Sequence, residues 1–521
     1  MSENLRLVQQ VRDRLPMPTA KLLCLVVGLL FLASIVYKGF LHPLRKIPGP
    51  TLARFTGLWR TYHYAIGDWH VEILRLHDTY GSVVRIAPNE VSVVDGETTK
   101  RLYGHGTSAK KTGWYQTWQV PEAADGFFAV QHSKNHAFLR KRVASAYSMS
   151  SMMKMEVYIQ GCLDLLMSRL KKHADKGEII DMSTWTVAFA YDVVGELAFG
   201  EQLGHLRTET DVKSIRKSIY DGFIVMSVLG HFRGQSRLVN NYFVNSLLEF
   251  LGTPNLFKSF TDWNQQRVID RQAQLERGLT KERDDLLSHF LRMKGRDGQP
   301  ASGPEILIEN LQIVGAGADT TAIGMRACLY YICQHPDVYK CVQEEIDAFY
   351  ETNKLTRPIT YQETQMMPYL QAVIKEATRL FPSINFQLIR HTPPGGLTVN
   401  GKFVPEGTEI GTSPIAQNRD KSVWGPDANE FKPDRWLKDE AQSRYYDSMN
   451  MLFGGNGPRQ CIGRNIALLE LHKFTAQLFR NFEVEFVDNN KPWQVATYWF
   501  SYQHDMKMRL KFRANRSIPD L

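Results

Sequence analysis

A glycine-rich loop near the C-terminus carries a single cysteine directly before an apolar stretch that is typical of a helix. The loop reads FGGNGPRQCIGR over residues 453–464, with the cysteine at Cys461. Glycines let a backbone approach a flat ligand closely, and a cysteine thiolate is a strong, electron-donating ligand of iron. Such a thiolate needs a cationic or dipolar environment, and a helix beginning near Gly463 would supply part of it through its positive end. Taken alone, the loop therefore predicts that Cys461 is a reactive thiol or a metal ligand at the start of a helix.

The six cysteines of the chain show no paired spacing. They are Cys24, Cys162, Cys328, Cys333, Cys341 and Cys461. The nearest to Cys461 is Cys341, which is too far along the chain to suggest a zinc or iron–sulfur cage of neighbouring cysteines. Most of the others lie in apolar helical contexts, where a buried free thiol is the default. The pattern indicates a reducing compartment and argues against a disulfide scaffold.

The N-terminal region contains an uncharged, apolar stretch. Residues 22–37 carry no charge, and Leu41 extends the stretch past Lys38. Its length approaches the ~20 residues that span a bilayer, so we expect a membrane anchor. A cleaved signal peptide is the alternative, but the sequence PLRKIPGP at 43–50 follows without a small-residue cleavage site. Basic residues flank both sides and do not decide the orientation, whereas the free thiols place the large domain in the cytosol.

The rest of the chain has no clear linker in its middle, so we expect one large domain. The formal net charge is +9, but lysines and arginines are dispersed, which disfavours nucleic acid as a partner. A basic patch for an acidic protein or for anionic lipid stays open. The expected division is an N-terminal flank at 1–21, an anchor at 22–41, a proline-rich hinge at 42–50, the large domain at 51–513 and a C-terminal tail at 514–521.

Helical patterns dominate from about residue 135 onward. Before them, residues 82–94 alternate around Pro88-Asn89, which predicts a β-hairpin. An apolar stretch at 304–334 predicts a helix on the order of 45 Å long, enough to cross a domain. Further elements are expected as a helix at 368–382, short strands at 387–410, a last helix from near 462 and an irregular or strand-like C-terminal stretch. The chain is therefore predicted to be mainly α with a small β subdomain.

The long helix contains a run of small and polar residues, AGADTT at 316–321. A mid-helix glycine costs about 1 kcal/mol relative to alanine, so the helix is locally weakened and could open a groove for a ligand. In such a groove Asp319 and Thr320 could hold water and relay protons. A kinked helix with a solvated acid is the alternative.

Two other helices carry charged residues that share a face. His136 and Arg140 are four positions apart, and both side chains can hydrogen-bond the carboxylates of an anionic cofactor. A solvated basic helix is the alternative. Glu376 and Arg379 are three positions apart, a spacing that by itself most often means a surface ion pair.

Taken together and in this order, these motifs resemble the cytochrome P450 family over nearly the whole chain. The resemblance implies the cytochrome P450 fold preceded by a transmembrane helix, and it makes Cys461 the proximal ligand of a haem iron. It implies that Asp319 and Thr320 are the catalytic acid and alcohol. The residues that it places at the haem propionates are His136, Arg140, Arg390 and Arg459. The residues that it places in a buried ion network supporting the fold are Glu376, Arg379 and Arg435.

One position departs from the family pattern. The family has an aromatic residue seven positions before the cysteine, where this chain has Gly454, and Phe453 lies one position earlier. The extra residue would still bring Phe453 against the haem, but the packing around the sulfur, and with it the potential of the iron, would differ.

The resemblance implies a haem-thiolate monooxygenase that inserts one oxygen atom of O2 into an apolar small molecule. Electrons would come from NADPH through NADPH-cytochrome P450 reductase, with cytochrome b5 as a further candidate partner. A single-pass anchor would hold the domain on the cytosolic side of the endoplasmic reticulum. The segments 113–115, 136–142 and 146–148 are similar to membrane-bound fungal P450s, the pisatin demethylase type included, and point to secondary (terpenoid, polyketide or alkaloid) or detoxifying metabolism.

Two alternatives stay open at this stage. One is a haem-thiolate isomerase or dehydratase that uses peroxides without a reductase, and the other is a non-catalytic, membrane-anchored haem-binding sensor. The intact pair of Asp319 and Thr320 argues against both.

The resemblance also implies where a substrate pocket and a reductase face would lie. By family position, the pocket draws on residues 113–130, 223–228, 316–320, 383–388 and Trp499-Phe500. The side chains that make it apolar would be Phe127, Phe128, Phe223, Met226 and Phe386, and ordinary core packing is the alternative for each. The basic residues that would attract an acidic reductase face are Arg140, Lys141, Arg142 and Arg464.

Overall fold

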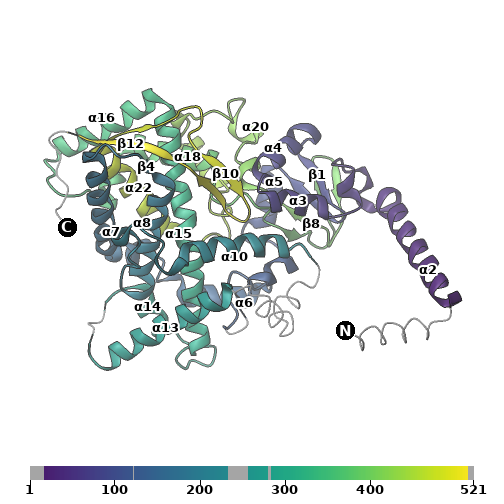
Figure 1. Ribbon diagram of the computed structural model, residues 1–521. Coiled ribbons are helices and arrows are strands. Elements are labelled where there is room, and N and C mark those ends of the chain that lie inside the picture. Colours follow the sequence, from purple (N-terminus) through teal and green to yellow (C-terminus); the bar gives the residue numbers. More distant parts are fainter. Residues whose placement is uncertain (1–16, 121–122, 233–255, 280–282, 514–521) are drawn as a thin grey trace.

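The computed structural model describes residues 17–120, 123–232, 256–279 and 283–513. The tail expected at 514–521 lies outside the described residues, and so does the flank expected at 1–21 except for residues 17–21. Helices form most of the described chain and short strands form small sheets (Figure 1). The prediction of a mainly α protein with a small β subdomain is confirmed.

The longer helices of the large domain are α3 (Leu58–Ile66), α4 (Trp69–Tyr80), α5 (Gly96–Tyr103), α6 (Ser133–Ala144), α7 (Met149–Asp175), α8 (Met182–Phe199), α10 (Ile215–Leu229), α13 (Leu256–Glu276), α14 (Leu286–Leu291), α15 (Gly303–Gln334), α16 (Pro336–Thr352), α18 (Pro368–Leu380), α21 (Glu440–Met449) and α22 (Arg464–Asn481). The strands are β1 (Val83–Ala87), β2 (Glu90–Val93), β3 (Lys110–Lys111), β4 (Ile180–Asp181), β5 (Arg390–His391), β6 (Leu397–Val399), β7 (Lys402–Val404), β8 (Glu409–Gly411), β9 (Phe482–Phe486), β10 (Gln494–Thr497), β11 (Ser501–His504) and β12 (Lys507–Phe512).

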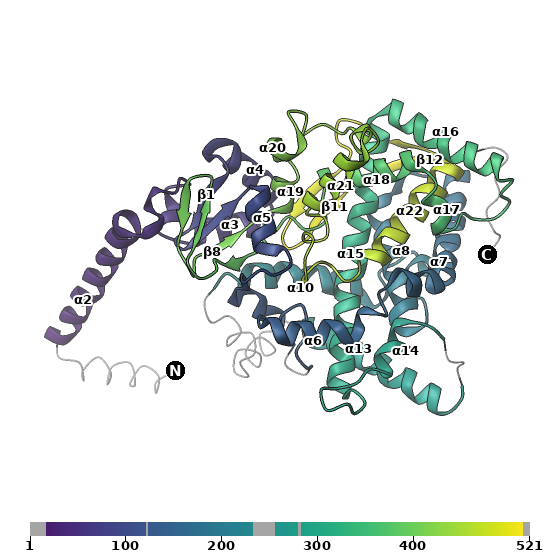
Figure 2. The same ribbon diagram turned by 180° about the vertical axis from the view of Figure 1, so that it is seen from behind.

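The central helix α15 runs through the domain, packed most extensively along α8 and also against α18 and α22 (Figures 1 and 2). It contains 32 residues and matches the helix predicted at 304–334. Ser302 and Glu305 form a capping box at its start, and Pro304 occupies its first turn, where a missing N–H costs nothing. Pro336 then opens α16. The helix is apolar on most sides, as is typical of a helix that is buried on most sides. Residues 316–321 therefore lie in the interior of the domain.

Helix α18 holds the ion network that the resemblance implied. The carboxylate of Glu376 accepts hydrogen bonds from Arg379 Nε and Nη2, both at 2.8 Å, and from Arg435 Nε at 2.7 Å. The Glu376 and Arg379 side chains are completely buried. Arg379 Nη1 also donates to the backbone carbonyls of Asn418 at 2.6 Å and Ala428 at 2.7 Å. A surface ion pair is therefore excluded, and the network ties α18 to the loops that precede the cysteine loop.

The strands form a five-stranded sheet in the order β1-β2-β8-β5-β3, a three-stranded sheet β4-β12-β9 and two hairpins, β6-β7 and β10-β11. The hairpin predicted at 82–94 is confirmed as β1 and β2, with Val83 opposite Val93. In the larger sheet, β3 pairs with β5 so that Lys111 lies opposite Arg390. This pairing brings together two cations that are far apart in the sequence.

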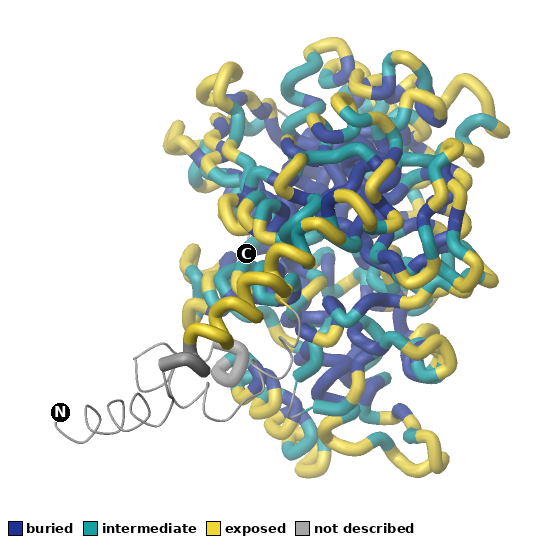
Figure 3. The backbone as a smooth tube through the Cα atoms, turned by 90° about the vertical axis from the view of Figure 1, so that its right-hand side faces the viewer, coloured by how far each residue is buried: buried dark blue, intermediate teal, exposed yellow. Residues whose placement is uncertain are grey.

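The N-terminal helix α2 (Met17–Val36) continues through a π-helical turn, η1 (Tyr37–Leu41), into the large domain. Residues Lys21–Leu41 form the one helix in the described part of the chain that is long and apolar enough to span a membrane. Figure 3 shows its surface as exposed along nearly its whole length. An apolar helix that covers no core of its own protein is consistent with a membrane anchor.

The segment between this helix and the domain packs onto the domain. Leu44 and Ile47 are at most 2% exposed and belong to the same core cluster as strands β1 and β2. The backbone N–H of Arg85 donates to the carbonyl of Pro48 at 2.7 Å. The Arg85 guanidinium donates to the carbonyl of Pro88 at 2.7 Å and reaches that of Lys38 at 3.4 Å. The segment expected to be a hinge is therefore held by the sheet.

Candidate active site

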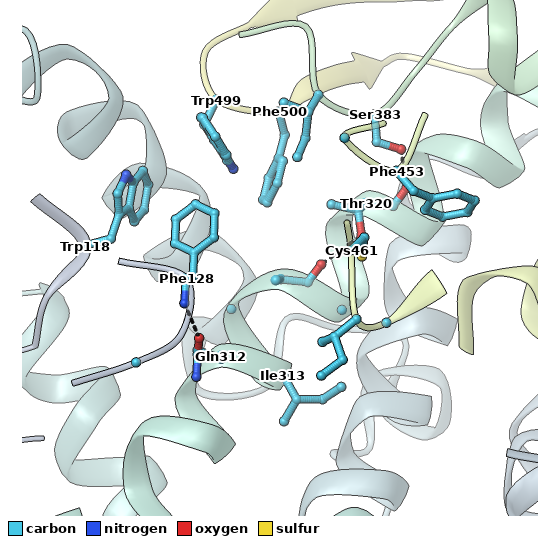
Figure 4. A pocket seen from close by; sticks show the side chains of 18 of the residues that line it. Trp118, Phe128, Gln312, Ile313, Thr320, Ser383, Phe453, Cys461, Trp499 and Phe500 are labelled. Atoms are coloured by element: carbon cyan, nitrogen blue, oxygen red, sulfur yellow. Dashed lines mark hydrogen bonds between the residues drawn. The ribbon is translucent and has the colours of Figure 1, made fainter. Parts of the chain in front are cut away.

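A cavity of about 340 Å³ lies between α15, α10, the segment that follows β3, the residues before β11 and the cysteine loop. Figure 4 shows Cys461 near Thr320 of α15, with Trp118, Phe128, Trp499 and Phe500 on another side. The Cys461 side chain is exposed although protein surrounds the loop, because it opens into the cavity. Among the described residues, no group of three or more His, Cys, Asp or Glu could hold a metal ion. Cys461 is the only cysteine among the described residues that line the cavity.

Glycines shape the cysteine loop because its backbone must turn tightly and pass close to α5. Gly454 and Gly455 have φ angles of +77° and +81°, a region that side chains with a Cβ disfavour. A Cβ on Gly457 would lie 1.8 Å from the backbone oxygen of Tyr103. The two left-handed glycines turn the backbone directly after Phe453.

Phe453 is hydrogen-bonded through its backbone to Cys461 and contributes its side chain to the cavity. Its carbonyl accepts a hydrogen bond from the backbone N–H of Cys461 at 2.9 Å, and its side chain lines the cavity. The guanidinium of Arg464 lies 5.7 Å from the centre of its ring. The geometry is compatible with a cofactor-contacting role for Phe453, which stays a prediction.

Burial raises the pKa of the Cys461 thiol above its ordinary value. The backbone N–H of Gly463, the charge of Arg140 and the backbone N–H of Arg464 act in the opposite direction. The helix end thus lowers the pKa of Cys461 as expected, but this effect is smaller than the increase caused by the loss of hydration. A bound metal ion would supply the missing positive charge, because a coordinating thiol is deprotonated by the metal itself.

Five basic side chains meet at the cavity. They are Lys111, His136, Arg140, Arg390 and Arg459. The structure thus brings together all four residues that the resemblance placed at the propionates and adds Lys111. None of the described residues that line the cavity is an aspartate or a glutamate.

The electrostatics of this basic cluster fit an anionic ligand. Burial and neighbouring positive charges together lower the pKa of Arg459 to about 10 and that of His136 to about 3. Burial also lowers the pKa of Lys111 well below its ordinary value, with Arg390 and Arg459 contributing. Unpaired charges of one sign are costly inside a protein. A flat group with two carboxylates would pair them, and haem has this shape and charge.

Lys111 was not predicted from the sequence, because the two lysines that make up β3 carry no functional signal of their own. Its ammonium donates to the carbonyl of Phe128 at 2.5 Å and lies 4.1 Å from the ring centre of Tyr115. The Tyr115 hydroxyl in turn accepts from Arg390 at 2.9 Å. Only the pairing of β3 with β5 brings Lys111 to Arg390, and that pairing is not readable from spacing.

The acid and the alcohol of α15 face different surroundings. Thr320 lines the cavity, and its hydroxyl donates to the carbonyl of Ala316 at 2.8 Å. Asp319 does not line the cavity and is only 5% exposed. It accepts a hydrogen bond from the Tyr502 hydroxyl at 3.3 Å. Of the two residues predicted to share a groove, Thr320 lines the cavity and Asp319 is buried next to it, and the proton-relay role of Asp319 stays a prediction.

The apolar wall of the cavity contains some, but not all, of the side chains predicted from the sequence. Phe127, Phe128 and Phe223 line the cavity, whereas Met226 and Phe386 lie in the core away from it. Phe386 instead stacks on Tyr64, with 4.4 Å between ring centres. Trp118 lines the cavity from within the predicted segment 113–130, and lining residues outside the predicted segments include Ile219, Gln312 and Ile313. Their contribution depends on the packing of α10 and the segment after β3 against α15.

Comparisons with known proteins agree with this geometry. The chain is 33% identical to "Cytochrome P450 monooxygenase gsfF" of Penicillium aethiopicum over 92% of this chain and 95% of that protein. It is 32% identical to "Pisatin demethylase" of Fusarium vanettenii over 92% of each. It is 30% identical to "Cytochrome P450 monooxygenase cicH" of Emericella nidulans over 93% of this chain and 97% of that protein. The profile of the cytochrome P450 family matches residues 47–511, and the chain belongs to this family.

Proposed function

We propose that this protein is a membrane-anchored haem-thiolate monooxygenase that oxidises an apolar small molecule. The observation that carries the proposal is the exposed Cys461 sulfur in an apolar cavity bordered by five basic side chains and by Thr320. Family membership supports the haem and the supply of electrons by a reductase. No observation favours the isomerase, dehydratase or sensor considered above.

When bound, haem supplies the activation of O2 and the transfer of one oxygen atom. Cys461 would hold its iron. The residues that would bind its carboxylates are Lys111, His136, Arg140, Arg390 and Arg459. Neutral His136 retains one N–H donor for this purpose.

Thr320 would accept a hydrogen bond from water beside the reacting centre. Its hydroxyl proton is committed to the carbonyl of Ala316, so its oxygen is free to accept a bond from water in the cavity. The Ser383 hydroxyl donates to the backbone carbonyl of Thr320 at 2.6 Å and fixes this part of α15. Asp319 would hold the proton that this site consumes.

The aromatic wall favours a neutral, apolar substrate. Trp118 packs on Phe223 with 4.9 Å between ring centres, and Phe223 packs on Phe500 at 4.6 Å. Such surfaces exclude water and bind apolar rings. Relatives include a pisatin demethylase, and we propose a role in fungal secondary or detoxifying metabolism.

A reductase would dock on the face of α6 and the start of α22. Lys141 and Arg464 are exposed there. Arg140 and Arg142 are not available, because Arg140 lines the cavity and Arg142 pairs with Glu305. We propose NADPH-cytochrome P450 reductase as the electron donor, cytochrome b5 as a further partner and the endoplasmic reticulum membrane as the location, with the large domain in the cytosol.

The test is the reduced carbon monoxide difference spectrum of the full-length protein in membranes. The thiolate-type Soret band is expected, and Cys461→Ser is expected to lose it. Wild-type protein with a reductase should consume NADPH only when a substrate from a panel of apolar compounds is added. A folded, haem-loaded wild type without the thiolate-type band would refute the proposal.

A further inference from the structure

Asp319 is held by residues that the family motif does not include. Its carboxylate accepts from the Tyr502 hydroxyl of β11 at 3.3 Å. The Tyr191 hydroxyl of α8 is fully buried without a direct hydrogen bond of normal geometry. It nevertheless lies near enough that the Asp319 charge raises the pKa of Tyr191 further, beyond the effect of burial. Two tyrosines from different elements therefore converge on one acid.

The cations near Asp319 act at a distance. Arg326 lies two turns further along α15 and donates to Gln503 at 2.8 Å and to the carbonyl of Ser183 at 2.8 Å. Arg216 of α10 is the other positive charge that acts on Asp319. Burial raises the pKa of Asp319 to about 6, opposed by Arg326, Tyr502, Arg216 and Tyr191. Tyr502 therefore makes the direct contact with the Asp319 carboxylate, and the two arginines act on that carboxylate through their electrostatic potential.

The hairpin that carries Tyr502 also forms part of the cavity wall. Trp499 and Phe500, in the turn of the β10-β11 hairpin, line the cavity, and Figure 4 shows both rings at its side. Tyr502 of β11 follows Phe500 of the turn by two positions, and the two rings lie side by side. Their ring centres are 6.0 Å apart. A molecule that pushes against Phe500 therefore acts on the strand that holds Asp319.

We propose that Tyr502 is a positioning residue that holds the Asp319 carboxylate away from the cavity, and that the β10-β11 hairpin couples this bond to the occupancy of the cavity. The inference rests on the proposed function and adds a substrate-dependent control of its proton source. When the cavity is filled, displacement of Phe500 moves Tyr502 and frees Asp319 to turn toward Thr320. When the cavity is empty, the proton stays on the far side of α15.

The test is an infrared titration of the Asp319 carboxyl in full-length, haem-loaded protein, with Asp319→Asn to assign the signal. Tyr502→Phe removes a hydrogen bond that favours the charged carboxylate, so the Asp319 titration should move upward by ~0.5–1 pH unit. Saturating the wild type with 4-phenylimidazole, an aromatic probe of the cavity, should move the titration in the same direction. In Tyr502→Phe the probe should produce no further shift.

Two variants control the experiment. Tyr498→Phe removes a hydroxyl from the same hairpin that has no bond to Asp319, and it should titrate as the wild type does. Phe500→Ala should leave the probe-free titration in place but abolish the shift caused by 4-phenylimidazole. It keeps the test possible if Tyr502→Phe does not fold. An unchanged titration in folded Tyr502→Phe, or a full probe-induced shift in Phe500→Ala, would overturn the inference. An intact carbon monoxide spectrum in the same samples would show that the proposed function had not failed with it.

Discussion

At the scale of single residues, Asp319 is a charge that the fold stabilises poorly. Burial raises its pKa from an ordinary 3.8 to about 6. The folded state then binds the proton more tightly than the unfolded state, so stability falls as the pH rises from about 4 to 6 and stays lower above that window. We expect Asp319→Asn to raise the free energy of unfolding by ~1–3 kcal/mol at pH 7.5 and to change it little at pH 4.

Thermal denaturation of wild type and Asp319→Asn at both pH values measures this difference. Thr320→Val is the matched control, because Thr320 lies beside Asp319 on α15 but carries no charge. A neutral-pH stability of Asp319→Asn equal to or below that of the wild type would contradict the prediction. The outcome matters for function, since a group kept at a cost to stability is typical of a catalytic site.

Arg142 and Glu309 form a buried charge pair close to the cavity wall. Arg142 donates to Glu305 at 2.5 Å and to Glu309 at 3.2 Å. Glu309 also accepts from Gln312 at 3.1 Å, and Gln312 accepts from the backbone N–H of Phe128 at 3.2 Å (Figure 4). The pair therefore holds the wall segment that carries Phe128.

We expect Arg142→Leu to destabilise the protein by ~3–5 kcal/mol at pH 8.5, because it leaves Glu309 buried without a cation. Burial already raises the pKa of Glu309 to about 7 with Arg142 present. Without Arg142 that pKa rises further, so protonation should reduce the loss at pH 6. Adding Glu309→Gln should recover most of the loss at pH 8.5. Urea unfolding of the two single variants and the double variant measures the coupling, and additive effects would argue against the pair.

At the scale of elements, the network on α18 joins this helix to the loops that carry Asn418, Ala428 and Arg435. Glu376 is the acceptor shared by Arg379, Arg435 and the indole N–H of Trp436. Glu376→Gln keeps the shape but leaves buried Arg379 without its counter-ion and leaves Arg435 with the more distant Asp427 at 3.4 Å. We expect a loss of ~3–5 kcal/mol and little or no haem-loaded protein.

The neighbouring residue offers a control for this substitution. Lys375 forms an ion pair with Asp447 at 2.8 Å, but its side chain is 37% exposed. Exposed pairs are worth less than about 1 kcal/mol, so Lys375→Gln should leave the yield of haem-loaded protein near that of the wild type. The Soret band of purified protein and its thermal midpoint measure both variants. Equal losses in the two would mean that burial of the network does not matter.

At the scale of the whole molecule, motifs with a local cause were predictable from the sequence. The helix at 304–334 follows from its cap and its apolar run, and the cysteine loop follows from glycines that its own backbone requires. What could not be predicted depends on packing between distant segments. Lys111 reaches the cavity through the pairing of β3 with β5, and Asp319 turns away because Tyr502, 183 positions later, supplies its partner.

The junction between the anchor and the domain also depends on packing between distant segments. This packing decides how far the chain can be truncated from its N-terminus without loss of stability. Leu44 and Ile47 look like part of a linker in the sequence, yet both are buried against the sheet. Deleting residues 1–36 removes the apolar helix and leaves these contacts intact. We expect this variant to show the thiolate-type Soret band, to melt as the full-length protein does and to float far less with membranes in a density gradient.

Deleting residues 1–50 should behave differently, because it removes Leu44, Ile47 and the bond from Arg85 to Pro48 together. Emptying the sites of two buried aliphatic side chains costs ~4–8 kcal/mol in total, which is a large part of the stability of a typical domain. We expect little folded, haem-loaded protein from this variant. Full-length protein with Leu44→Ala and Ile47→Ala separates the two effects, since it should stay on the membrane and still lose stability. If the deletion of 1–50 were as stable as the deletion of 1–36, the segment would be a hinge in the ordinary sense and Arg85 would not be fixing the anchor.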